Sequence, residues 1–183
     1  GNFTTIRALL DSGITPMTLR LFTLQAHYRK PLDFSADALE AAATGWKGLN
    51  AALGLAASTS SADPGATPEL AAARARFAAA MDDDLNTSSA LAVLFELAKP
   101  LRALANRLER GDSSAAAEAR APELVEQGQL LLELAGVLGL KSETEAKTSS
   151  TSPGPSDAEI QAQIDQRQAA KAAKDFPAAD GIR

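Results

Sequence analysis

Several residue types that carry chemistry in proteins are missing or rare in this sequence. It has no cysteine and one histidine among 183 residues, which excludes disulfide bonds, thiolate zinc sites and cysteine-based catalysis within these residues. No glycine-rich phosphate loop and no carboxylate pair at a meaningful spacing occurs. No apolar run approaches the roughly 20 residues that a membrane-spanning helix needs. We therefore predict no catalytic, cofactor-binding or metal-ligating residue in this chain and no association with a membrane.

The residues that are abundant predict a helical protein. Hydrophobic residues make up 45% of the chain, enough for a real core, and alanine and leucine dominate, whereas runs of β-branched residues are missing. We predict an all-α fold. The net charge of −5, from 18 Lys+Arg against 23 Asp+Glu, argues against binding of nucleic acid by diffuse attraction. Any contact with RNA must be local.

Capping residues predict where the helices begin. A Thr-Pro pair opens a helix from Pro16 to about Tyr28, whose buried face would carry Met17, Leu21, Leu24 and Tyr28. Further predicted helices begin after Ser35, at Thr67-Pro68, at Ser88 (to Arg110, with a bend or an interruption at Pro100), at Pro122 (to Leu138, ended by Gly139) and at the capping box Ser156–Glu159. In the helix that begins after Ser35, the predicted core positions are Leu39, Ala42, Trp46, Leu49 and Leu53.

Composition predicts the boundaries between these regions. Ser, Pro and Gly are concentrated at residues 58–67, which we expect to be a loop, and at 141–155, which lack an apolar stripe and which we expect to be disordered. The predicted organisation is helices at 1–57, the loop at 58–67, a helical bundle at 68–140, the linker at 141–155 and a final helix at 156–183.

Three adjacent aspartates, Asp82, Asp83 and Asp84, lie between two predicted helices. Their charge suits the start of the following helix, for which Thr87 is the expected N-cap. The sequence favours a solvated acidic turn over a metal site, because consecutive side chains diverge and the alternating ligands of a calcium loop are missing.

Basic residues gather on two predicted helix faces. The clearest polar face of the chain, opposite a stripe of leucines, carries Lys99, Arg102, Arg107 and Arg110. A second set, on and after the final helix, comprises Arg167, Lys171, Lys174 and Arg183. Such residues suit phosphate contacts, which fix the position of a nucleic acid without reading its sequence. An ordinary solvated helix surface is the competing interpretation.

Four sequence blocks, in order along the chain, resemble one known family. They are Gly1–Arg7, Leu19–Arg29 with its His-Tyr-Arg ending, Met81–Thr87, and Lys174–Arg183. Together they are similar to the C-terminal part of bacterial-type cysteinyl-tRNA synthetases, which are class I aminoacyl-tRNA synthetases. In that family a Gly-Asn-Phe sequence directly follows the Lys-Met-Ser-Lys-Ser signature loop, so we expect this chain to be a fragment that begins after the catalytic machinery and lacks a small C-terminal domain.

The resemblance implies a fold, partners and a cellular location. We expect linker helices followed by an antiparallel helix bundle of the class I anticodon-binding type, in a cytoplasmic enzyme that joins cysteine to tRNA(Cys). The parent enzyme would use ATP with magnesium and a zinc ion, all bound upstream. This fragment would contact tRNA(Cys) and the catalytic domain of its own polypeptide, and it should be inactive alone.

Two other functions remain open from the sequence. One is the helical part of the mycothiol-pathway ligase that joins cysteine to an amino sugar, which shares the His-Tyr-Arg block. The other is a non-enzymatic helical module that docks onto a protein, for which the acidic balance is the support.

Overall fold

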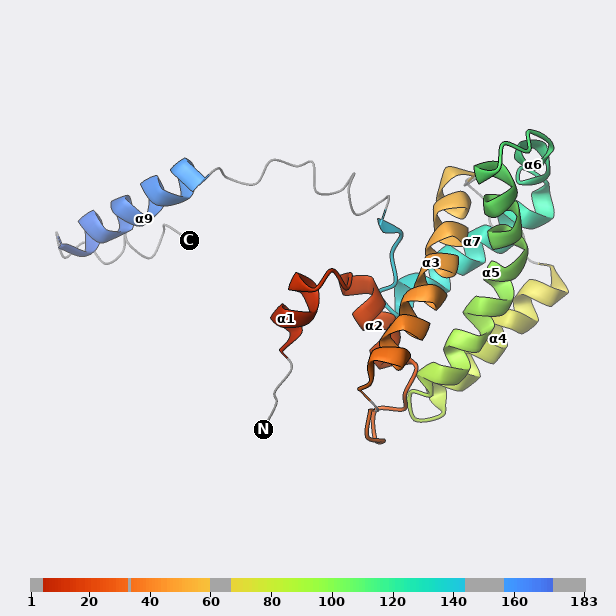
Figure 1. Cartoon of the computed structure of the whole chain (residues 1–183), viewed down its shortest axis with the longest axis horizontal. Coiled ribbons are helices and arrows are strands. Elements are labelled where there is room, and N and C mark those ends of the chain that lie inside the picture. The colour runs from red at the N-terminus through yellow and green to blue at the C-terminus, as the bar shows by residue number, and fades with distance from the viewer. Residues whose placement is uncertain (1–4, 33, 60–66, 144–156, 173–183) are drawn as a thin grey trace. The chain divides into compact units, whose positions relative to one another are not determined.

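The computed structural model describes residues 5–32, 34–59, 67–143 and 157–172. These residues form helices and contain no strand. The helices, shown in Figure 1, are α1 Ile6–Asp11, α2 Pro16–Leu24, α3 Ala36–Ser58, α4 Pro68–Asp82, α5 Thr87–Glu109, α6 Ser114–Glu118, α7 Pro122–Val137 and α9 Asp157–Ala172. The all-α prediction is confirmed.

The chain divides into two compact units, Gly1–Ala146 and Lys147–Arg183. In the first unit α5 is central, because it contacts α2, α3, α4, α6 and α7 (Figure 1). Residues 1–57 and 68–140 were predicted to form separate regions, but α3 packs directly against α5 and α7. One hydrophobic core therefore spans both regions.

Apolar side chains at helical spacing build this core. All five predicted core positions of α3 are buried, and Leu94 and Leu101 of α5 and Leu131 of α7 are fully enclosed. Removal of such side chains from water is the main stabilising contribution to the fold. The buried face also explains why α5 runs through Pro100 without interruption, since packing on several sides offsets the one backbone hydrogen bond that proline removes.

The caps predicted from the sequence are largely confirmed. The hydroxyls of Thr15, Ser35 and Thr67 each accept a hydrogen bond from the backbone N–H three residues later. Gly139 has a positive φ of 67°, as expected of the residue after a helix end. The capping box at Ser156 lies outside the described residues.

The prediction that α2 continues to Tyr28 was wrong. The helix ends at Leu24, and the next residues turn so that Tyr28 is 60% exposed rather than buried. Tyr28 leaves the helix face because a distant residue binds it: the Tyr28 hydroxyl donates a 2.6 Å hydrogen bond to Asp84 Oδ1. Helical periodicity carries no information about a contact made so far along the chain.

The first residues of the predicted linker, 141–143, lie against the first unit. Leu140 and Ser142 are buried, and Glu143 is bound on α3, where its backbone N–H donates to Asn50 Oδ1 and its carboxylate accepts from Trp46 Nε1, both at 2.9 Å. Residues 141–143 are therefore part of the first unit. The rest of the predicted linker, 144–155, lies outside the described residues.

The aspartates form the predicted helix-to-helix corner, but its cap was misassigned. Asn86 is the N-cap of α5, since its side-chain oxygen accepts from the Ser89 N–H at 3.2 Å. Thr87 lies in the first turn, and its hydroxyl instead donates to the Leu24 carbonyl oxygen at 2.8 Å. Thr87 therefore ties α5 to the end of α2.

We expect Asn86→Ala to lower the free energy of unfolding by about 1 kcal/mol, because it leaves an N–H of the first turn without its acceptor. Asn86→Ser is the matched control and should be nearly neutral, since serine caps as well as asparagine. Urea unfolding followed by circular dichroism measures both. Equal losses for the two variants would show that the side-chain cap contributes nothing.

Candidate nucleic-acid interface

The structure places the predicted basic residues in two separate units. Lys99 and Arg102 lie exposed on α5, Arg107 is half-buried near its end, and Arg110 is its exposed C-cap residue. Arg167 is exposed on α9 in the second unit. The side chain of Lys171, and Lys174 and Arg183 entirely, lie outside the described residues. Only the α5 set can therefore be examined as a surface.

Arg107 is bound by side chains of its own unit. Its Nε donates to Asp112 Oδ2 at 2.8 Å, its Nη1 to Glu118 Oε2 at 2.5 Å and its Nη2 to Ser114 Oγ at 3.0 Å. The hydroxyl of Ser114 and the guanidinium of Arg107 together lower the pKa of Asp112 to about 2, so this carboxylate is ionised at neutral pH. Two carboxylates thus offset the charge of Arg107, which connects the end of α5 to α6 and is poorly suited to hold a phosphate.

Arg74 and Arg76 of α4 are engaged in the same way. Arg74 forms a forked pair with Glu133 of α7, and Arg76 Nη2 lies 2.6 Å from Glu96 Oε2 of α5. Hydrogen bonding from Arg76 lowers the pKa of Glu96. These pairs join neighbouring helices, and each cation already has a carboxylate partner.

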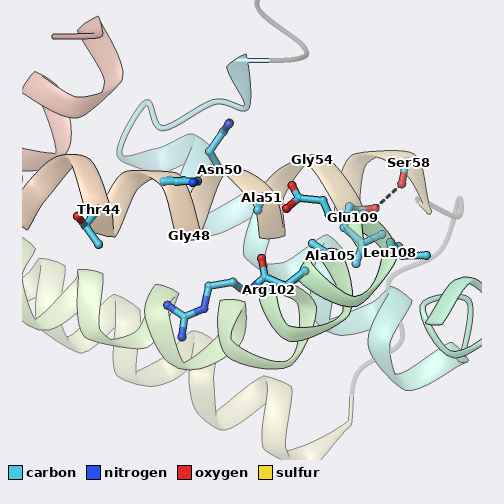
Figure 2. Close-up of a pocket in the computed structure, with 13 residues that line it drawn as sticks. Thr44, Gly48, Asn50, Ala51, Gly54, Ser58, Arg102, Ala105, Leu108 and Glu109 are labelled. Carbon is cyan, nitrogen blue, oxygen red and sulfur yellow. Dashed lines mark hydrogen bonds between the residues drawn. The ribbon is translucent and has the colours of Figure 1, made fainter. Parts of the chain in front are cut away.

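A groove of about 790 Å³ lies between α3 and α5 (Figure 2). Polar side chains from both helices line it, with Thr44, Lys47, Asn50 and Ser58 on α3 and Arg102, Asn106 and Glu109 on α5. A second hollow of about 160 Å³ adjoins it, and Arg102 lines both. Lys99 lines the smaller hollow.

Arg102 lies against α3 at a glycine. A Cβ atom added at Gly48 would be 2.8 Å from Arg102 Cδ, too close without a shift of that side chain, and 3.2 Å from its Nη1, which is a tight contact. Figure 2 shows the side chain extending toward Gly48, away from Glu109. Glycine in the interior of a helix normally costs stability, so its presence here indicates a close approach rather than a helix preference.

Three cations along this seam have no carboxylate partner in the part of the chain that the structure describes. The ion pairs found among the described residues involve His27, Arg29, Arg74, Arg76 and Arg107, and none involves Lys47, Lys99 or Arg102. We name these last three residues the seam cations. Lys47 was not predicted from the sequence, since α3 was interpreted only through its core positions. The signal that could have found it was the adjacent Gly48.

A second cluster joins the acidic corner to the loop after α2. Asp84 accepts from Tyr28 and also lies 3.1 Å from Arg29 Nε and 3.8 Å from His27 Nε2. The rings of His27 and Tyr28 are stacked, with centroids 4.9 Å apart. Describing the aspartates as a merely solvated turn was therefore wrong for Asp84, which binds a loop more than fifty residues earlier in the chain.

Within the described part of the chain, no three His, Asp or Glu side chains are grouped so as to hold a metal ion. No helix in those same segments is long and apolar enough to cross a membrane.

Comparison with known proteins agrees with this architecture. A model of the DALR domain matches residues 76–142, which include α5 and α7. The whole chain also matches three cysteine–tRNA ligases. It is 59% identical to that of Synechococcus sp. (strain CC9605), 57% identical to that of Parasynechococcus marenigrum (strain WH8102) and 55% identical to that of Prochlorococcus marinus (strain MIT 9303). In each case the match covers 40% of the relative's length. The matched region is the C-terminal part of those relatives.

Proposed function

We propose, on the ground that the chain belongs to the cysteine–tRNA ligase family, that it supports and positions tRNA(Cys) for ATP-dependent attachment of cysteine. The single observation that carries the proposal is the identity of up to 59% along the whole chain to ligases of this name. The chain spans about two fifths of the length of these relatives, and the DALR match lies in its bundle. Neither the amino-sugar ligase nor the interaction module gains support from these matches.

The chemistry of the reaction belongs, in this proposal, to other parts of the enzyme. The residues present do not fit a thiolate zinc site, because there is no cysteine and one histidine. We propose that ATP with magnesium and zinc is bound outside these 183 residues, in a cytoplasmic enzyme. The role of this chain is mechanical and electrostatic, since a rigid bundle with placed cations can fix a nucleic acid relative to a distant active site.

We expect the 183-residue chain alone to show no cysteine-dependent ATP–pyrophosphate exchange above background. The full-length enzyme that contains it should show this exchange and should attach cysteine to tRNA(Cys) but not to an amino sugar. Exchange by the isolated, pure chain would contradict its assignment as a non-catalytic part. Attachment of cysteine to an amino sugar by the full-length enzyme would favour the alternative ligase.

A further inference from the structure

We infer that the seam between α3 and α5 holds the sugar–phosphate backbone of the tRNA, with Arg102 as the central contact and Lys47 and Lys99 beside it. This inference rests on the proposed function and deepens it, because it moves the contact from the polar face of α5 alone to a groove that two helices share. Arg102 and Lys99 were predicted as contacts from the sequence, whereas Lys47 was not. Arg107 is no longer assigned as a contact.

The charge of the seam cations supports this inference. Arg74, Arg76 and Arg107 each contact a carboxylate, whereas the seam cations contact none among the described residues. In a chain with a net charge of −5, cations on one seam that have no ion pair with a described residue form the local positive surface that a polyanion requires.

The position of the Arg102 side chain also supports this inference. A free arginine loses rotamer entropy when it binds, and this loss weakens binding. Arg102 lies against the backbone of α3, in the space left by the missing side chain of Gly48. Its guanidinium is therefore positioned by packing rather than by an ion pair. A planar guanidinium can donate two parallel hydrogen bonds to one phosphate, which a lysine cannot do.

The groove has a polar lining that suits a sugar–phosphate backbone. It is lined by polar groups such as the side-chain amide of Asn106, which is a common partner of phosphate and sugar oxygens. Glu109 lines the same groove and would repel a phosphate. We infer that Glu109 limits how far the backbone extends along the groove toward the end of α5.

The experiment measures KM for tRNA(Cys), and its dependence on salt, in the full-length enzyme. Arg102→Ala should raise KM by about tenfold, as expected for the loss of one charged hydrogen-bonded contact, with little change in kcat. The log–log slope of binding against salt should fall in magnitude by up to about 0.9, the value per phosphate contact on duplex DNA. Glu109→Gln should act in the opposite direction and lower KM.

Gly48→Ala tests the positioning without removing any charge. The added methyl group would displace Arg102, so KM should rise as in Arg102→Ala, although less. Gly136→Ala is the matched control, because it is also a glycine inside a helix but has no atom within 4 Å of its added Cβ. Gly136→Ala should leave KM, kcat and the salt slope unchanged. Thermal unfolding checks that each variant is folded. If Arg102→Ala is not folded, Arg102→Gln at the same exposed position replaces it.

The outcomes separate this inference from the function on which it rests. An unchanged KM and salt slope in folded Arg102→Ala or Arg102→Gln enzyme would overturn the seam as the contact, while continued attachment of cysteine to tRNA(Cys) would leave the proposed function intact. An effect of Arg107→Ala on the salt slope equal to that of Arg102→Ala would also overturn it. Failure of the unmodified enzyme to use tRNA(Cys) at all would instead remove the proposed function.

Discussion

Gly128→Leu is expected to lower the free energy of unfolding by about 3 kcal/mol, since overpacking of a close helix contact is costly. Gly128 is buried on α7, where it meets α3. A Cβ at this position would be 3.0 Å from Ala56 Cβ and 3.4 Å from Ala56 Cα. The second of these atoms belongs to the backbone of α3, so relief requires a shift of the helix rather than a rotation of a side chain.

Gly136→Leu provides the comparison on the same helix. The residue is exposed, and no atom lies within 4 Å of the added Cβ. Leucine has a better helix propensity than glycine, so this variant should be stabilised by up to about 1 kcal/mol. Both substitutions replace glycine by the same better helix former. The difference between their free energies of unfolding, measured with urea, therefore reports the cost of overpacking at position 128. If Gly128→Leu were as stable as Gly136→Leu, the contact between α3 and α7 would be looser than the structure shows.

The contrast between these glycines illustrates which parts of the fold a sequence can predict. Caps such as Thr15 and Ser35 act on backbone groups three residues away, and the core positions of α3 follow from a local period, so both were predicted correctly. The closeness of Gly128 to Ala56 depends on how two helices cross. Such a distance is a property of the assembled core, and neither segment encodes it alone.

The same limit applies to the candidate interface. The basic face of α5 was predicted from periodicity, but the difference between Arg102 and Arg107 lies in residues outside that helix. Asp112 and Glu118 follow α5 and fold back onto Arg107. Gly48 belongs to α3, and its missing side chain leaves room for the side chain of Arg102. Whether a cation is paired or available is decided by tertiary neighbours, which a count of charges on one face does not reveal.

Asp84→Ala is expected to lower the free energy of unfolding by about 2 kcal/mol, whereas Asp83→Asn should be nearly neutral. About 1 kcal/mol arises from the contacts of Asp84 with the loop after α2, a small value because the ion pair with Arg29 is exposed. The remaining ~1 kcal/mol arises from the backbone, because Asp84 has a φ of 51° and alanine tolerates this left-handed conformation poorly.

Asp84→Gly separates these two contributions. Glycine removes the same side-chain contacts but adopts a positive φ without strain, so it should be about 1 kcal/mol more stable than the alanine variant, less its own entropic cost. Urea unfolding of the three proteins measures the difference. Equal stability of the alanine and glycine variants would show that the positive φ at this corner stores no strain.

The contact itself can be measured through Tyr28, which is the single tyrosine of the chain. Its hydrogen bond to Asp84 raises the pKa of Tyr28 above 10.0, because the phenol donates to a carboxylate that would repel a phenolate, and the hydrogen bond from Arg29 opposes the shift. Asp84→Asn keeps a residue that tolerates the backbone conformation but removes the charge, so the pKa should fall toward or below 10.0. Since the folded pKa is the higher one, the stabilisation is fully present below pH 10 and is lost as the pH rises through the folded pKa. Phenolate absorbance of the isolated chain against pH measures the titration, and identical curves for the two proteins would show that Asp84 does not hold Tyr28 in solution.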